Sequence, residues 1–143
     1  MENTIVELKF SLDTFYFLIS GILVMWMAAG FAMLEAGLVR SKNTTEILTK
    51  NIALYSIACT MFLLVGYNIM YVDNAEGGII PSIGALIGTQ AADADHSLES
   101  DFFFQVVFVA TAMSIVSGAV AERMKLFAFL AFAVVLTGFI YPM

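Results

Sequence analysis

Hydrophobic and polar positions fall into long blocks along this chain, rather than alternating over a few residues. Four runs contain no charged side chain, and each is separated from the next by a polar segment. Each run has about the 17–25 residues that a helix needs to cross a hydrocarbon core of roughly 30 Å. The pattern therefore predicts an all-α membrane protein, a polytopic helix bundle with spans at about residues 14–37, 45–72, 102–122 and 126–143.

The polar segments between these runs predict where the helices begin. Residues 73–101 form a predicted outer loop, whose uncharged stretch 77–90 is too short to span and is interrupted by glycine and proline. Asn43 and Glu46 have the spacing of a capping box, which predicts the start of the second helix. Asp101 is the predicted N-cap of the third span.

Composition supports the membrane class. Of 143 residues, 61% are hydrophobic and 13% are charged, whereas soluble domains carry roughly 25% charged residues. The net charge of −6 gives no indication of nucleic-acid binding.

The distribution of basic residues predicts an orientation. Lysines and arginines flank the two tight turns, at Arg40 and Lys42 and again at Arg123 and Lys125, whereas residues 73–101 contain none. Short loops rich in lysine and arginine stay in the cytoplasm. We therefore expect the amino terminus and the long loop to lie outside a cell membrane, plasma or inner.

Few residues indicate chemistry. We expect no enzyme and no cofactor, because metal-ligand spacings, nucleophile–base pairs and phosphate-binding glycine loops are lacking. His96 is interpreted as part of a solvated loop. Ionisable residues within spans are functional candidates, but Glu35 is interpreted as an ion-pair partner of nearby Arg40 and Lys42.

One face of the third predicted span carries two phenylalanines one turn apart. Phe104, Phe108, Thr111 and Ile115 follow the i, i+4, i+7, i+11 spacing of a single helix face. An aromatic face attracts a cation by roughly 0.5–2 kcal/mol, and more when water is excluded. Without further context, such phenylalanines are more often lipid or packing contacts.

Two stretches resemble the ammonium transporter family (Amt/Mep/Rh). They are GFAMLEAGLVRSKNTTEILTKN, residues 30–51, and FQVVFVATAMSIVSGAVAERMK, residues 104–125, of which EAGLVRSKN and GAVAER are the specific parts. The resemblance covers nearly the whole chain and implies the first four of about eleven helices, most of the first of two inverted repeats. It also implies a homotrimer with one hydrophobic pore per subunit.

The resemblance implies roles for individual residues. Aligning the GAVAER string places Phe104 at the substrate-recruitment position and Phe108 at the pore gate, where a hydrophobic constriction closes by dewetting. Thr111 and Ile115 then line the pore, and Phe31 and Leu34 border its lower part. Ammonium is expected to lose its proton at the gate, since an ion in low dielectric is costly.

Other parts of the family's pore lie beyond this sequence. The two pore histidines, the second gate phenylalanine, and the acidic residue and tryptophan of the recruitment site have no counterpart before Met143. We therefore expect the chain to be the amino-terminal part of a longer protein. A PII-type regulator on the cytoplasmic side is a candidate partner.

Two alternatives remain open at this point. An Amt-like domain can feed a signalling module, and a fused kinase or cyclase downstream would indicate such an ammonium sensor. A free-standing four-helix membrane protein with a structural role would instead end at Met143 and be stable without further helices.

Overall fold

The computed structural model describes residues 2–71, 87 and 94–143, and these fold into helices without any strand. The all-α class is thereby confirmed. The elements are α1 (Glu2–Leu38), the 3-10 turn η1 (Ser41–Asn43), α2 (Thr44–Met61), the π-helical η2 (Phe62–Gly66), α3 (Tyr67–Tyr71), α4 (Leu98–Ala119), α5 (Leu126–Val135) and the π-helical η3 (Leu136–Ile140).

Three helical stretches are long and apolar enough to cross a membrane. They are Thr4–Leu38, Ser41–Tyr71 and Leu98–Ala119, while Leu126–Ile140 is apolar but shorter. The first stretch begins well before the predicted span, because the polar residues ahead of Thr14 continue the helix. The predicted outer loop 73–101 falls largely outside the described residues, as does its segment 77–90 apart from Ile87.

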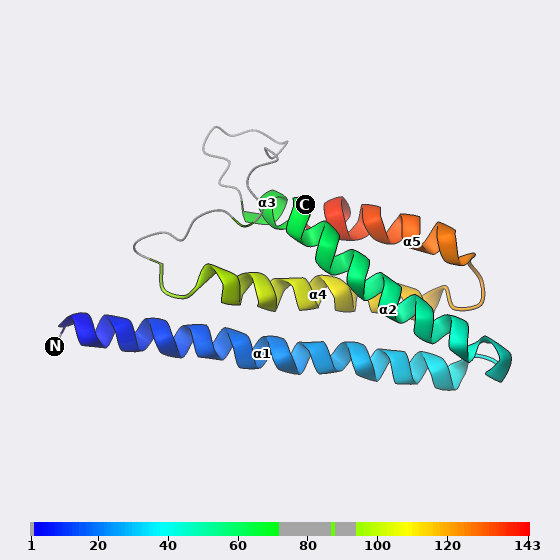
Figure 1. Ribbon diagram of the computed structural model, residues 1–143, viewed down its shortest axis with the longest axis horizontal. Helices are drawn as coiled ribbons and strands as arrows, with labels where there is room; N and C mark the ends of the chain where they lie inside the picture. Colours follow the sequence, from blue (N-terminus) through cyan, green and yellow to red (C-terminus); the bar gives the residue numbers. More distant parts are fainter. Residues whose placement is uncertain (1, 72–86, 88–93) are drawn as a thin grey trace.

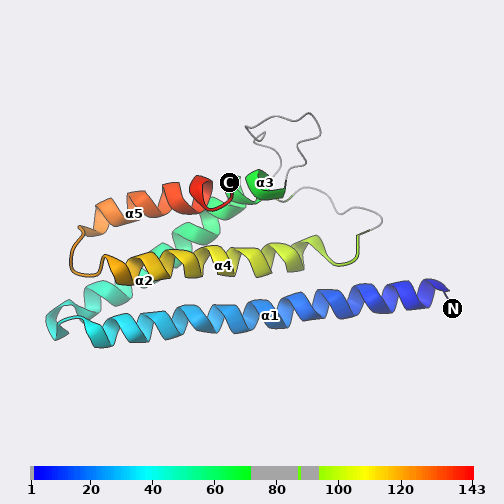
Figure 2. The same cartoon turned by 180° about the vertical axis from the view of Figure 1, so that it is seen from behind.

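The helices lie side by side as roughly aligned rods (Figures 1 and 2). α1 and α4 run in the same direction and pack along each other, while α2 crosses obliquely and contacts both α4 and α5. The turn before α2 and the turn before α5 therefore lie at the same end of the bundle. These turns carry Arg40, Lys42, Arg123 and Lys125. The uneven distribution of charge along the sequence therefore becomes a difference in charge between the two ends of the helix bundle.

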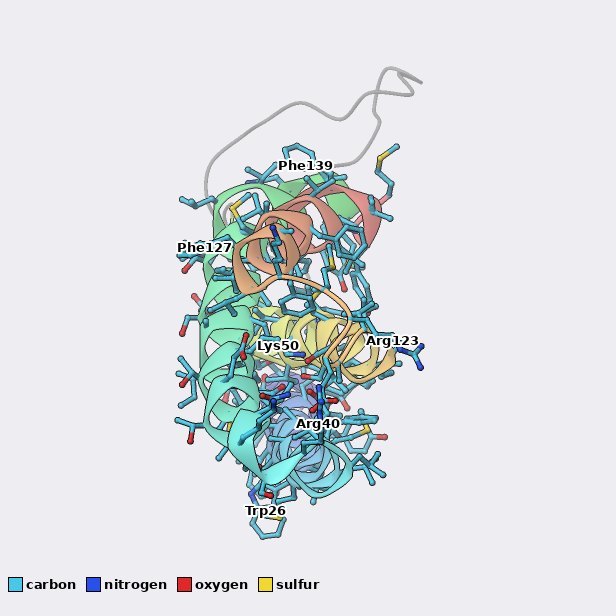
Figure 3. The ribbon with its side chains drawn as sticks, turned by 90° about the vertical axis from the view of Figure 1, so that its right-hand side faces the viewer. Trp26, Arg40, Lys50, Arg123, Phe127 and Phe139 are labelled. Carbon is cyan, nitrogen blue, oxygen red and sulfur yellow. The ribbon has the colours of Figure 1, made fainter. Side chains whose placement is uncertain are left out.

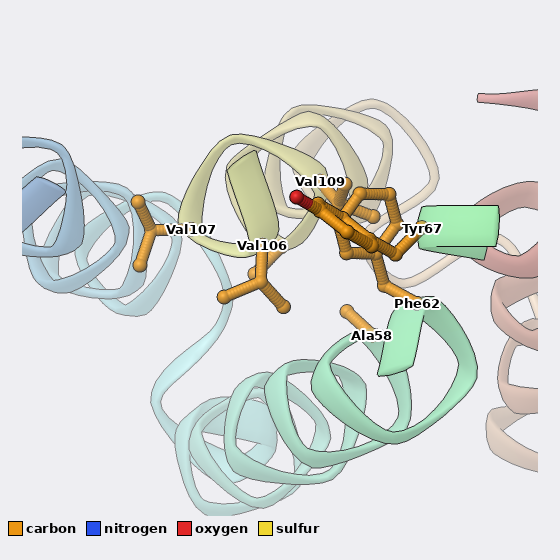
Figure 4. Close-up of a cluster of buried hydrophobic side chains, with 7 residues drawn as sticks. Ala58, Phe62, Tyr67, Val106, Val107 and Val109 are labelled. Atoms are coloured by element: carbon orange, nitrogen blue, oxygen red, sulfur yellow. The ribbon is translucent and has the colours of Figure 1, made fainter. Parts of the chain in front are cut away.

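Two buried clusters hold α2, α4 and α5 together. In the first, Phe62 and Tyr67 pack against α4 beside Val106 and Val109 (Figure 4). Phe62 stacks on Phe102 with ring centroids 5.9 Å apart. The second cluster contains Leu54, Met113, Phe129 and Ala133.

Small residues allow close approach where the two π-helical segments meet. A Cβ at Gly66 would lie 3.1 Å from the Thr137 carbonyl oxygen and 3.1 Å from Pro142 Cγ. Close backbone approach of this kind is how membrane helices pack, since lipid is as apolar as the side chains.

Both predicted caps need correction. The N-cap of α4 is Ser97, so Asp101 lies inside the first turn and is buried. Asn43 is the N-cap of α2 as predicted, but its side chain makes no capping hydrogen bond. Its amide instead donates to Glu122 Oε1 at 2.6 Å. In both places a partner distant in the sequence binds the side chain that a local cap would have used: Glu122 of the α4–α5 turn binds Asn43, and Tyr67 and Tyr71 of α3 bind Asp101.

Candidate functional site

Phe104 and Phe108 belong to a row of four rings at one end of the bundle. The row runs from His96 to Phe17, Phe104 and Phe108, with successive centroid separations of 4.5, 5.3 and 5.0 Å. It joins the segment before α4, helix α1 and helix α4. The two phenylalanines singled out from the sequence therefore lie against each other, edge to face.

α1 approaches α4 closely beside this row. A Cβ at Gly21 would lie 2.7 Å from the Phe103 ring, so a larger residue there would displace the ring or the helix. Helix α1 is also joined to the segment before α4 by Lys9, whose ammonium donates to Asp95 Oδ1 at 2.6 Å. That hydrogen bond holds the pKa of Asp95 below its usual range.

The other predicted pore residues have different environments. Thr111 is 2% exposed, and its hydroxyl donates to the Val107 carbonyl within the same helix. Ile115 and Leu34 are 55% and 56% exposed, and Phe31 is half-buried. None of these residues lines either of the two hollows described below, and their pore-lining role stays a prediction.

A buried carboxylate lies at the same end as the ring row. Asp101 accepts hydrogen bonds from the Tyr67 hydroxyl at 3.1 Å and from the Tyr71 hydroxyl at 3.4 Å. Tyr67 also packs edge-on against Phe102, with centroids 5.4 Å apart. α3 and the start of α4 are thus held by a small polar cluster within aromatic surroundings.

A second buried polar cluster ties the other end of the bundle together. Glu35 and Lys50 are both buried, with Lys50 Nζ 3.6 Å from Glu35 Oε2. The Ser117 hydroxyl donates to the same Oε2 at 2.8 Å, and Lys50 donates to the Ser117 carbonyl at 3.1 Å. Lys50 also lies 4.8 Å from the centre of the Phe129 ring.

The interpretation of Glu35 is therefore corrected. Its ion pair is with Lys50 of α2, and not with Arg40 or Lys42, which are closer along the chain. Arg40 pairs with Glu122 instead, with Nε 3.1 Å from Oε2. Figure 3 looks onto this end and shows Lys50 among the helices, with Arg40 and Arg123 nearer the viewer and Trp26 pointing away from the bundle.

Two hollows accompany these clusters. One, of about 130 Å³, lies next to Lys50 and Glu122 at the basic end. The other is an apolar cleft of about 500 Å³ between α1 and α2, bordered by Met25, Ala28, Ala32, Ile52 and Tyr55. Neither borders Phe104 or Phe108.

Sequence reasoning missed Phe17 and the role of Asp101. Phe17 lies in an aromatic run near the start of the first predicted span, at the level where α4 carries its own aromatics, and that shared level was the available signal. Asp101 was predicted to cap the backbone of the third span, because a carboxylate at the start of a helix commonly serves as its N-cap.

Comparison with known proteins points to one family. The model of the Ammonium Transporter Family matches residues 15–143. The chain is 39% identical to ammonium transporter Amt2 of Archaeoglobus fulgidus, over 91% of this chain and 27% of that protein. It is 43% identical to ammonium transporter Amt2 of Haloferax mediterranei, over 84% of this chain and 27% of that protein.

A eukaryotic relative gives the same result. Ammonium transporter 3 of Dictyostelium discoideum is 37% identical over 95% of this chain and 30% of that protein. The chain thus spans only a quarter to a third of the length of the curated relatives that it matches.

Proposed function

The chain belongs to the ammonium transporter family, and we propose that it forms the outer aromatic site and one side of the gate in a membrane pathway for ammonium. In this proposal Phe104 attracts the cation from water and Phe108 closes the route below it. The substrate class comes from the relatives, which are named ammonium transporters.

The observation that carries the proposal is the contact between the two rings. Phe104 and Phe108 lie with centroids 5.0 Å apart at 72°, so the edge of one ring meets the face of the other. A ring face is electron-rich and attracts a cation, while a constriction lined by apolar rings excludes water. Recruitment and closure can therefore occupy successive turns of a single helix.

The energetics favour a neutral species below the gate. Moving an ammonium ion without its water into an apolar path costs far more than moving ammonia, because the charge loses its solvation. We propose that the proton is left on the outer side of Phe108. Thr111 and Ile115 would then border the path of the neutral molecule, with Phe31 and Leu34 nearer the basic end.

The assembly and orientation are further parts of this proposal. We propose a homotrimer in a cell membrane, with the amino terminus outside and the basic turns in the cytoplasm. A PII-type protein is the proposed regulator at the cytoplasmic face. The shared end of Arg40 and Arg123 supports this orientation, since basic turns remain inside.

The gate assignment is tested with Phe108→Ala in the protein as expressed from its own gene. We expect altered uptake of methylammonium, because removing the ring opens the constriction, with an unchanged oligomer on size-exclusion chromatography. Phe127→Ala is the matched control, since Phe127 is 83% exposed and lies on α5. Uptake by Phe108→Ala equal to that of the control would contradict the gate.

A further inference from the structure

We propose that Asp101 is a specificity-determining residue of the outer site. Its carboxylate, held by Tyr67 and Tyr71, would supply the fixed negative charge that favours a small monovalent cation such as ammonium over neutral solutes at the start of α4. This inference rests on the proposed function and adds an electrostatic element to the ring row.

The carboxylate is built into the fold. Asp101 is 7% exposed, and both of its oxygens accept a hydrogen bond, Oδ2 from Tyr67 and Oδ1 from Tyr71. The Gln105 side chain, one turn further along α4, is another partner of the Tyr71 hydroxyl. Two phenolic donors thus fix the position of this carboxylate between α3 and α4.

No basic side chain compensates this charge within the described parts of the chain. The ion pairs there join Lys9 to Asp95, Arg40 to Glu122 and Lys50 to Glu35. A buried charge without a counter-ion is costly, and such residues in membrane proteins commonly mark ion pathways. A cation that arrives nearby would recover part of that cost.

The position of Asp101 relative to the rings suits this role. Asp101, Phe104 and Phe108 are spaced i, i+3, i+7, so they share one face of α4, with Asp101 nearest the outer end. Tyr71, which donates to Asp101, is 45% exposed. Its hydroxyl proton is donated to Asp101 and Gln105 is a second partner of the same hydroxyl, which leaves one lone pair of the oxygen for a donor such as ammonium.

A purely structural role is the competing explanation. Asp101 ties α3 to α4, and acidic residues are common in the first turn of a helix for structural reasons alone. The two roles differ in what a neutral replacement changes. Loss of a tie lowers thermal stability and the amount of active protein, whereas loss of a charge changes the concentration at which transport saturates.

The test uses Asp101→Asn in the protein as expressed from its own gene. Asparagine keeps the size; its Oδ1 can accept a hydrogen bond from one tyrosine, and its Nδ2 can donate to the hydroxyl oxygen of the other. We expect the half-saturation concentration for methylammonium to rise about fivefold, the size that one screened unit charge near a site gives. Maximal uptake and the melting temperature should stay close to wild type, and Asp101→Glu should restore the affinity.

Three comparisons sharpen the result. Glu99→Gln removes the same charge from an exposed residue in the same turn and should change half-saturation less. Raising ionic strength should weaken the affinity of the wild type more than that of Asp101→Asn. Tyr67→Phe, which removes one hydrogen bond but keeps the ring, should raise half-saturation in the same direction as Asp101→Asn.

The outcomes separate this inference from the proposed function. Uptake by the wild type with unchanged half-saturation in Asp101→Asn would overturn the inference and leave ammonium transport standing. The same holds if Asp101→Asn lowers only maximal uptake and melting temperature. Absence of methylammonium uptake by a correctly inserted wild type would contradict the proposed function itself.

Discussion

Phe104 illustrates how one residue can serve two purposes. Its ring contacts Phe17 of α1 on one side and Phe108 on the other, with centroids 5.3 and 5.0 Å away. It is therefore both a packing element between helices and a candidate cation site. Aromatic pairs contribute about 0.5–1.5 kcal/mol beyond their buried area, so replacing the ring affects stability as well as affinity.

The two contributions of Phe104 can be measured separately. In Phe104→Leu, which keeps an apolar contact to Phe17, we expect methylammonium uptake to fall at low concentration more than at saturation, because leucine retains part of the packing but has no ring face to attract the cation. Phe103→Leu is the matched control on the next position of α4. Equal loss for Phe104→Leu at all concentrations would argue against recruitment, and the kinetics of initial uptake give the answer.

At the scale of elements, the Glu35–Lys50 cluster connects four helices. Glu35 comes from α1, Lys50 from α2, Ser117 from α4 and Phe129 from α5. Glu35 Oε1 and Asn51 Oδ1 have no hydrogen-bond partner among the described residues. The cluster is therefore sensitive to the loss of any partner, since the remaining buried groups already have little compensation.

Removing one partner of this ion pair should destabilise the helix packing. Lys50→Met leaves a buried carboxylate without its cation and should cost about 3–5 kcal/mol. Adding Glu35→Gln to Lys50→Met should recover much of the loss. Lys42→Met, at an exposed position of the preceding turn, is the control. Thermal unfolding in detergent measures the effect, and a Lys50→Met protein as stable as the control would refute it.

The sequence predicts the helices themselves better than it predicts which side chains of different helices meet. A membrane helix is specified by about twenty consecutive residues, so the apolar runs and their order could be read from the chain. The partners of Glu35 and Arg40 could not, because sequence proximity favours nearby charges while the fold brings in Lys50 and Glu122. Phe104 and Phe108 were paired correctly because both lie on one helix. Phe17 belongs to another helix and was missed.

At the scale of the whole molecule, the outer surface and the ends differ. α1 exposes many large apolar side chains along its length, among them Leu23, Trp26 and Met33. Such a surface suits contact with lipid or with further membrane helices, because neither requires polar groups. The ends carry the charge, with acidic residues and the Lys9–Asp95 pair at one and the basic turns at the other.

This difference between the ends predicts which residues a water-soluble label reaches. In a cysteine-free background, Asp95→Cys should react with a membrane-impermeant maleimide on intact cells, whereas Lys125→Cys should react only after permeabilisation. The reason is that basic turns stay in the cytoplasm while the acidic end is translocated. Losing the exposed Lys9–Asp95 pair costs little, so Asp95→Cys leaves the fold intact.

The protein that keeps only Cys59 is the control for this labelling, because that thiol is partly buried within α2 and should react under neither condition. Labelling of Lys125→Cys on intact cells would show that the protein has the opposite orientation. It would also place the ring row of Phe104 and Phe108 on the cytoplasmic side, where it could not capture ammonium for uptake.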